Sequence, residues 1–119
     1  MCDGIVKYKG QYYILEIKTE SSYKNTCRKE IAKEHYNQAI TYSICLGINK
    51  VLFLYENRDN CDKKAFILEV TEEMKNSVFL KIKECNEYVE KLITPPKPKE
   101  VSKYACTYCS YISLCRKLG

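Results

Sequence analysis

The chain has 119 residues, of which 45% are hydrophobic and 29% are charged, proportions that are typical of one folded domain. No run of residues is long or apolar enough to span a bilayer, and the N-terminus lacks the apolar core of a signal peptide. We therefore expect a cytoplasmic protein, whose eight cysteines stay reduced rather than forming a disulfide framework.

The net charge of +5 is concentrated in the C-terminal quarter of the chain. Residues 91–119 contain six Lys or Arg and one acid, Glu100, whereas the rest of the chain carries fourteen basic and fourteen acidic residues. Such a basic segment either binds along the phosphate backbone of a nucleic acid or is a solvated tail. Charge alone does not distinguish these two interpretations.

Residues 2–18 contain two apolar-rich runs joined by a short connection with Gly10, a pattern that predicts a β-hairpin. A hairpin brings the far ends of its two strands together. We therefore expect Asp3, at the start of the first strand, to lie beside Glu16, near the end of the second.

Side chains alternate between the two faces of a strand, so Glu16 and Lys18 are predicted to share one face. The same alternation places Ile17 on the opposite face, pointing into the core. Two carboxylates and a lysine then meet at one edge of a sheet, which makes a candidate site for a hard cation such as Mg²⁺ or Mn²⁺.

After the hairpin, local patterns predict a loop, a helix, two paired strands and a second helix. The first of these strands is continuously apolar, which indicates that it is covered on both faces. Thr71, followed by two acids, is typical of a helix N-terminus. In chain order the predicted ranges are a loop at 19–28, a helix at 29–46 ending at Gly47, strands at 50–55 and 65–70, and a helix from 72.

The second helix is predicted to be amphipathic and to precede a Pro-rich linker at residues 94–100. Residues 1–93 would form an α/β core with a mixed sheet flanked by helices, and residues 94–119 a linker and cysteine module. The predicted buried stripe of the helix consists of Met74, Val78, Ile82, Cys85, Val89 and Leu92.

This order of elements, with Asp3 and the Glu16-x-Lys18 motif on the hairpin, resembles the PD-(D/E)XK nuclease superfamily, which has a restriction-endonuclease-like fold. The Gln38-x-x-x-Tyr42 motif on the following helix resembles the RecB-like exonuclease branch of that superfamily. Each motif alone is weak, but together they occur in the family's order. The resemblance extends over essentially the whole chain and implies a metal-dependent DNA exonuclease.

The resemblance also implies a role for each residue of the hairpin motif. Asp3, Glu16 and the backbone carbonyl of Ile17 would hold Mg²⁺ or Mn²⁺, which supports phosphodiester hydrolysis. Lys18 would position the attacking water and stabilise negative charge in the transition state.

On the helix, Gln38 and Tyr42 would line the DNA path or orient the catalytic lysine. The single histidine, His35, lies on the same stripe of this helix at helical spacing. It either contacts DNA or is an ordinary residue of the helix surface.

At the C-terminus, Cys106-x-x-Cys109 and Cys115 resemble the iron–sulfur subset of these nucleases, which includes CRISPR-associated and bacteriophage enzymes. Three close thiols suit a [4Fe–4S] cluster, while zinc and free thiols remain alternatives. In that subset the fourth ligand lies upstream of the catalytic aspartate, where this chain has only Cys2. We expect the other cysteines to be packing or surface residues.

Members of this superfamily have a helix before the hairpin, which covers one side of the sheet. Here the chain begins two residues before Asp3, so we expect exposed apolar surface and either self-association or a completing protein chain. The alternative to an exonuclease is a non-catalytic DNA-binding or assembly module, or one half of a split nuclease. DNA repair, recombination, and CRISPR or phage DNA processing are all compatible pathways.

Overall fold

The computed structural model describes residues 1–101 and 103–117. Ser102, Leu118 and Gly119 of the predicted cysteine module lie outside the described residues, as does the side chain of Lys103. The chain divides into two compact units, Met1–Lys83 and Glu84–Gly119. The boundary therefore falls before residue 94, where the sequence placed the start of the cysteine module.

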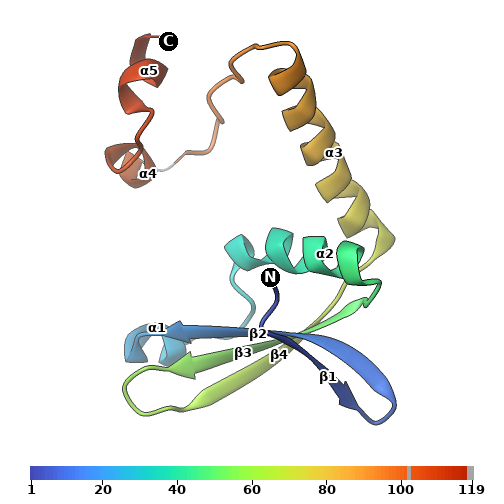
Figure 1. Cartoon of the computed structure of the whole chain (residues 1–119). Coiled ribbons are helices and arrows are strands. Elements are labelled where there is room, and N and C mark those ends of the chain that lie inside the picture. Colours follow the sequence, from blue (N-terminus) through green and yellow to red (C-terminus); the bar gives the residue numbers. More distant parts are fainter. Residues whose placement is uncertain (102, 118–119) are drawn as a thin grey trace. The chain divides into compact units, whose positions relative to one another are not determined.

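A four-stranded sheet forms the centre of the first unit (Figure 1). The β1/β2 and β3/β4 pairs are antiparallel, and β2 and β3 are parallel, so the sheet is mixed. The predicted α/β class, with cysteines in the C-terminal region, is confirmed. The strands are β1 (Gly4–Tyr8), β2 (Gln11–Glu20), β3 (Lys50–Asn57) and β4 (Lys63–Glu69), in the spatial order β1-β2-β3-β4.

The predicted N-terminal hairpin is present, and two residues make its turn. Lys9 and Gly10 both have positive φ angles, 45° and 79°. Positive φ at both central residues matches the twist of the flanking strands, and a glycine adopts it without strain. The resulting register pairs Gly4 with Leu15, so that Asp3 and Glu16 follow at the next position.

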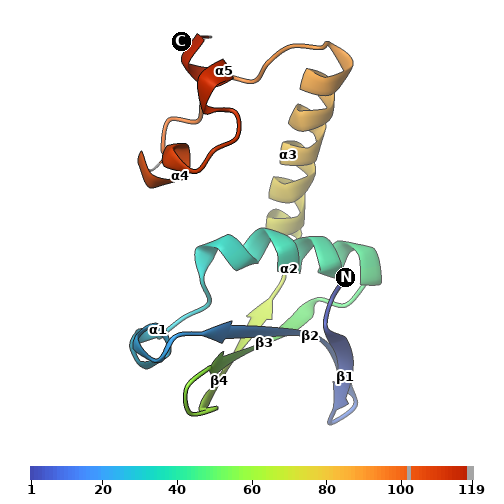
Figure 2. The same ribbon diagram turned by 60° about the vertical axis from the view of Figure 1, so that its left-hand side comes forward.

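Helix α2 (Lys33–Leu46) lies across one face of the sheet (Figures 1 and 2). It ends at Gly47, whose φ of 66° and N–H bond to the Ser43 carbonyl make the predicted C-cap. The helix begins four residues later than predicted because Ala32 is extended and donates its N–H to Tyr55 Oη at 3.1 Å. The residues buried in this region include Ile14, Ile31, Ala39, Ile40, Val51, Phe53, Tyr55 and Leu68.

The opposite face of the sheet is apolar and open. Leu52 and Leu54 on β3 are only half-buried, Ile17 is 43% exposed and Ile67 is 61% exposed. The predictions that Ile17 points into the core and that β3 is covered on both faces are therefore wrong. The reason is that α2 packs on the other face of the sheet (Figure 2).

Residues 19–28 do not form the predicted loop. Thr19 and Glu20 extend β2, and helix α1 (Ser22–Cys27) follows, capped by the Ser21 side chain. Lys64 on β4 holds this helix, since its ammonium group donates to the carbonyls of Asn25 and Arg28 at 2.6 and 3.1 Å. A lysine distant in sequence thus satisfies the C-terminal carbonyls of a short helix.

Helix α3 (Glu72–Glu90) begins after Thr71, whose hydroxyl accepts the Met74 N–H as predicted. Its buried stripe is shorter than predicted. Val78 is buried and Met74 packs against the core, but Ile82 is 46% exposed. Further along, Cys85, Val89 and Leu92 are also exposed, so the prediction is wrong for these residues. Only the first turns of α3 contribute to the core of the first unit.

The second unit contains two short helices, α4 (Lys103–Thr107) and α5 (Ile112–Lys117), which follow a Pro-rich segment without regular structure at residues 94–100. Among the helices of residues 1–101 and 103–117, none has the length and apolarity needed to cross a membrane.

Candidate active site

Asp3 lies where the hairpin was predicted to place it. Its backbone N–H donates to the Leu15 carbonyl at 3.2 Å, which extends the β1/β2 ladder by one step. One carboxylate oxygen, Oδ2, accepts the backbone N–H of Ile17 at 2.7 Å. Asp3 is otherwise exposed, so this bond fixes the carboxylate at the edge of the sheet while leaving its other oxygen accessible.

Glu16 is the most unusual residue of the site because its side chain is charged and only 2% exposed. Its Oε2 lies 3.2 Å from the ammonium group of Lys18. Its Oε1 is buried and has no hydrogen-bond partner among the described residues. A buried carboxylate oxygen without a partner costs about 1–3 kcal/mol or more, and native proteins retain few of them outside functional sites.

Lys18 joins the hairpin to helix α2. Its Nζ donates to Gln38 Oε1 at 2.8 Å, and Gln38 Nε2 donates to Tyr42 Oη at 3.1 Å. Tyr42 in turn donates to the backbone carbonyl of Met1 at 2.9 Å. The one-turn spacing of Gln38 and Tyr42 makes this chain possible. Contacts between side chains thus join Glu16, Lys18, Gln38 and Tyr42 in one chain, while Asp3 bonds the backbone of Ile17, between Glu16 and Lys18 in sequence.

His35, on the same helix, has a different environment. Its ring stacks on Phe53 and Tyr55, and its Nδ1 lies 2.8 Å from Tyr55 Oη. Burial lowers the pKa of His35 below its usual 6.5, and the positive charge of Lys18 lowers it further. The imidazole is therefore neutral at pH 7 and acts here as a packed, hydrogen-bonded residue.

The donor set fits a hard divalent cation in chemistry but is small. Asp3 and Glu16 provide carboxylate oxygens, one of them buried and unpartnered, and the Ile17 carbonyl belongs to the residue directly after Glu16. Within residues 1–101 and 103–117, no group of three or more His, Cys, Asp or Glu side chains is arranged to hold a metal ion. Water and a substrate phosphate would have to complete the shell, as is usual for Mg²⁺.

Sequence patterns missed a second charged network beside the site. Glu20, 6% exposed, receives hydrogen bonds from Arg28 Nε at 2.8 and 2.9 Å and from Asn25 Nδ2 at 3.1 Å. Although burial acts to raise the pKa of Glu20, these hydrogen bonds lower it overall. The Arg28 guanidinium also lies 4.1 Å from the centre of the Tyr55 ring. No periodicity or motif marks this pair, because α1 alone brings Arg28 back to the strand.

The three C-terminal cysteines line one cavity of about 740 Å³ within the second unit, together with Val101, Ile112 and Arg116 among others. Cys106 and Cys115 are half-buried and Cys109 is exposed. Within the described part of the chain these thiols are not arranged as a preformed set of metal ligands.

The other cysteines have ordinary surroundings. Cys2 packs against the hydrophobic core, and the remaining four are exposed, as expected for packing and surface residues. Those four are Cys27, Cys45, Cys61 and Cys85.

Neither a protein-family model nor a curated protein matches this sequence. The fold is similar to that of a solved structure described as "Crystal structure of SSO0001", with a TM-score of 0.59 and 19% sequence identity. The match covers 98% of this chain and 50% of that chain, so this chain spans about half the length of the structure that it resembles. At this level of identity the likeness shows the fold alone.

Proposed function

We propose that this chain is a metal-dependent deoxyribonuclease that hydrolyses single strands or DNA ends as an exonuclease. The observation that carries the proposal is Glu16, a buried carboxylate with one unpartnered oxygen beside the ammonium group of Lys18. A structural ion pair would satisfy both oxygens, as Glu20 does with Arg28. An unsatisfied oxygen next to a cation instead suits a group that binds a ligand.

Each residue then has a role that follows from its contacts. Asp3, Glu16 and the carbonyl of Ile17 would hold Mg²⁺ or Mn²⁺, an ion that supplies positive charge beside the phosphate and lowers the pKa of water. Lys18, held between Glu16 and Gln38, would orient the attacking water and stabilise negative charge.

Gln38 and Tyr42 act on the site through hydrogen bonds. Gln38 fixes the ammonium group of Lys18, and Tyr42 holds Gln38 next to the backbone of Met1. Gln38 is exposed, so the same side chain is also accessible to a DNA backbone.

For the C-terminal unit we propose that Cys106, Cys109 and Cys115 ligate a [4Fe–4S] cluster, with zinc as the alternative. The cavity that all three cysteines line supports this assignment, because thiolates are the usual ligands of such clusters. A cluster of this kind, and the free thiols elsewhere, fit a reducing cytoplasm. A bacterial or phage-infected cell fits the sequence resemblance.

A second candidate function is a DNA-binding or assembly module without catalysis, or one half of a split nuclease. It is favoured by the absence, among residues 1–101 and 103–117, of three or more His, Cys, Asp or Glu side chains arranged around one ion.

The deciding experiment measures degradation of end-labelled linear DNA by the pure protein with Mn²⁺. We expect Glu16→Ala and Lys18→Ala to reduce the rate about 100-fold or more. Glu56→Gln, a change at a half-exposed ion pair on β3, is the matched control and should leave the rate unchanged. Equal activity of the parent and the site variants would eliminate the nuclease, and DNA binding without degradation would establish the second candidate. Resistance of circular DNA distinguishes an exonuclease from an endonuclease.

A further inference from the structure

Three tyrosines of the second unit are exposed far beyond what is usual for this residue. Tyr104 is 78% exposed, Tyr108 is 82% exposed and Tyr111 is 71% exposed. Tyrosine has a large apolar ring and is intermediate in burial among the residue types of proteins, so side chains that are more than two thirds exposed stand out. Three such rings within eight residues indicate a surface that contacts a partner.

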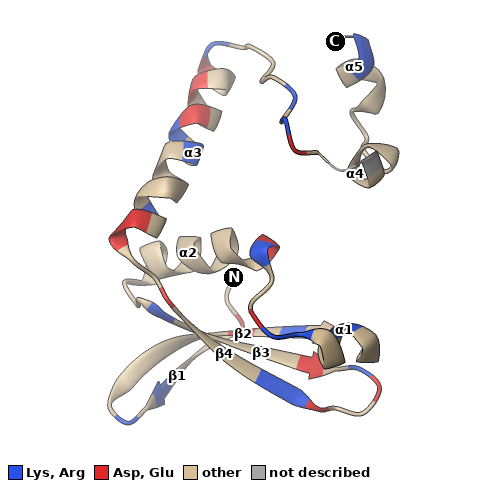
Figure 3. Cartoon of the chain, turned by 180° about the vertical axis from the view of Figure 1, so that it is seen from behind, with Lys and Arg blue, Asp and Glu red and all other residues tan. Residues whose placement is uncertain are grey.

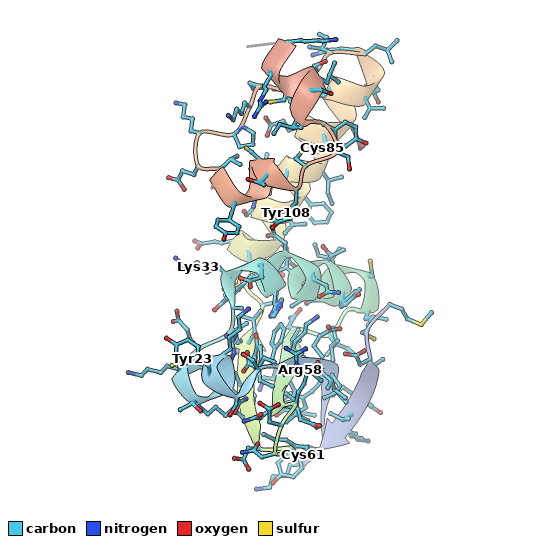
Figure 4. All side chains as sticks on the ribbon, turned by 90° about the vertical axis from the view of Figure 1, so that its left-hand side faces the viewer. Tyr23, Lys33, Arg58, Cys61, Cys85 and Tyr108 are labelled. Atoms are coloured by element: carbon cyan, nitrogen blue, oxygen red, sulfur yellow. The ribbon has the colours of Figure 1, made fainter. Side chains whose placement is uncertain are left out.

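Two of the rings form a pair. Tyr104 lies in α4 and Tyr108 directly after it, and their ring centres are 6.5 Å apart with planes tilted by 34°. The spacing of four residues places them on one side of the helical turn. Tyr108 is labelled in Figure 4. The pair offers neighbouring aromatic surfaces that a flat ligand can stack on.

The third ring borders a groove. Tyr111 and Leu114 line a groove of about 730 Å³ together with Pro95, Pro96 and Lys97 of the Pro-rich segment. This volume is within the range of about 300–1,000 Å³ that is usual for sites that bind small molecules. The residues that line the groove are mostly apolar, and Lys97 adds a positive charge.

The charge around these rings is positive. Arg116 and Lys117 form the last turn of α5 (Figure 3), and Lys97 lines the groove. Glu100 is the single acid in the sequence from residue 91 to the C-terminus. Exposed aromatic rings interleaved with cations are the combination that binds single-stranded nucleic acid, because bases stack on the rings while phosphates meet the cations.

We propose that Tyr104, Tyr108 and Tyr111 form a stacking platform for single-stranded DNA. The inference rests on the proposed nuclease and names its substrate as the single strand. Duplex DNA is excluded from the platform because its bases are already stacked on each other and paired. The alternative polyanionic partner, the phosphate backbone of a duplex, would contact the lysines and arginines but would not need the rings.

The test measures binding of a fluorescent oligothymidylate by anisotropy, with the full chain carrying Glu16→Gln so that the strand is not degraded. We expect Tyr104→Ala, Tyr108→Ala and Tyr111→Ala each to weaken binding by roughly fivefold to 150-fold. The corresponding Phe variants keep the rings and should bind within about twofold of the parent. Tyr23→Ala, a change at an equally exposed tyrosine on α1 (80% exposed), is the matched control.

The proposal is overturned if the Ala variants bind as the parent does, if the Phe variants lose as much as the Ala variants, or if duplex DNA or single-stranded RNA binds more tightly. Far-UV circular dichroism checks that each variant is folded, and the Phe variants decide the question if an Ala variant is not. A parent chain that binds the strand but never cleaves it refutes the nuclease and leaves the platform standing. Cleavage that is unaffected by the Ala variants at low DNA concentration refutes the platform and leaves the nuclease standing.

Discussion

The ammonium group of Lys18 on β2 donates a 2.8 Å hydrogen bond to the amide oxygen of Gln38 on α2. This bond joins two motifs that are twenty residues apart in sequence. It also holds the lysine next to Glu16, whose other oxygen has no partner in the described residues. The lysine is therefore oriented before any ligand binds, which is the condition for electrostatic stabilisation at low reorganisation cost.

Gln38→Ala tests this positioning. The variant removes the acceptor of the Lys18 hydrogen bond, so we expect the cleavage rate to fall about tenfold with little change in KM. Because the Gln38 side chain is exposed, the free energy of unfolding should change by less than about 0.5 kcal/mol. Steady-state kinetics and urea unfolding measure the two effects. Asn37→Ala, at the adjacent exposed position of α2, is the control, and an equal loss of rate there would contradict the assignment.

Arg28→Met tests the buried ion pair that holds α1. Removing one partner leaves the Glu20 carboxylate buried without its cation, and we expect a loss of about 3–5 kcal/mol in the free energy of unfolding. Urea unfolding monitored by circular dichroism measures it. The double variant Glu20→Gln/Arg28→Met should lose less than the sum of the single variants, because the uncompensated charge is gone. Additive losses would show that the two side chains do not act as a pair.

His35 predicts a pH dependence of stability. Its pKa is lowered in the folded state, so the unfolded chain binds a proton more readily than the folded chain does. The contribution of neutral His35 to the free energy of unfolding is fully present above pH 6.5, the usual pKa of histidine. It is lost as the pH falls through the lowered pKa of His35 in the folded chain. The positive charges of Lys18 and Arg28 lower the pKa of His35, whereas the negative charges of Glu34 and Glu16 raise it.

We expect the urea midpoint to decrease as the pH is lowered below 6.5 and the decrease to be smaller in His35→Phe, which keeps the stacking on Phe53. The effect of Glu20, whose pKa is lowered from 4.5, appears only at more acidic pH. An unchanged slope in His35→Phe between pH 5 and 7, about the range in which histidine titrates, would show that another group is responsible.

The open face of the sheet predicts self-association of two copies. Leu54 and Ile67 lie at its centre. On β3 the same face also carries Lys50 near one end of the strand and Glu56 near the other. Two copies stacked with antiparallel strands would bury the apolar centre and place each lysine opposite a glutamate. We expect Leu54→Lys to shift the protein towards monomer in sedimentation equilibrium, whereas Phe79→Thr on α3 should not. A monodisperse parent monomer at moderate concentration would refute the prediction.

The cysteine module predicts a coloured protein. If a [4Fe–4S] cluster is bound, anaerobically purified protein should show visible absorption from thiolate-to-iron charge transfer, and Cys106→Ser or Cys115→Ser should reduce it. Cys61→Ser, at an exposed cysteine of the first unit, should keep it. A colourless protein containing stoichiometric zinc would favour the alternative ligand.

Local signals in the sequence determined the hairpin and much of the candidate site. The turn at Gly10 sets the register by itself, and that register brings Asp3 next to Glu16. The one-turn spacing of Gln38 and Tyr42 similarly requires only a helix. These features depend on neighbours in sequence, so backbone geometry alone specifies them.

Tertiary structure decided which face of the sheet is covered and what lies against it. Alternation along β2 separates Ile17 from Glu16 but does not reveal that Glu16 is the buried one. The helix α1 depends on Lys64, a residue about forty positions later, and therefore has little signal of its own. Periodicity states which side chains share a face, whereas burial depends on the elements that pack there, and that is a property of the folded chain.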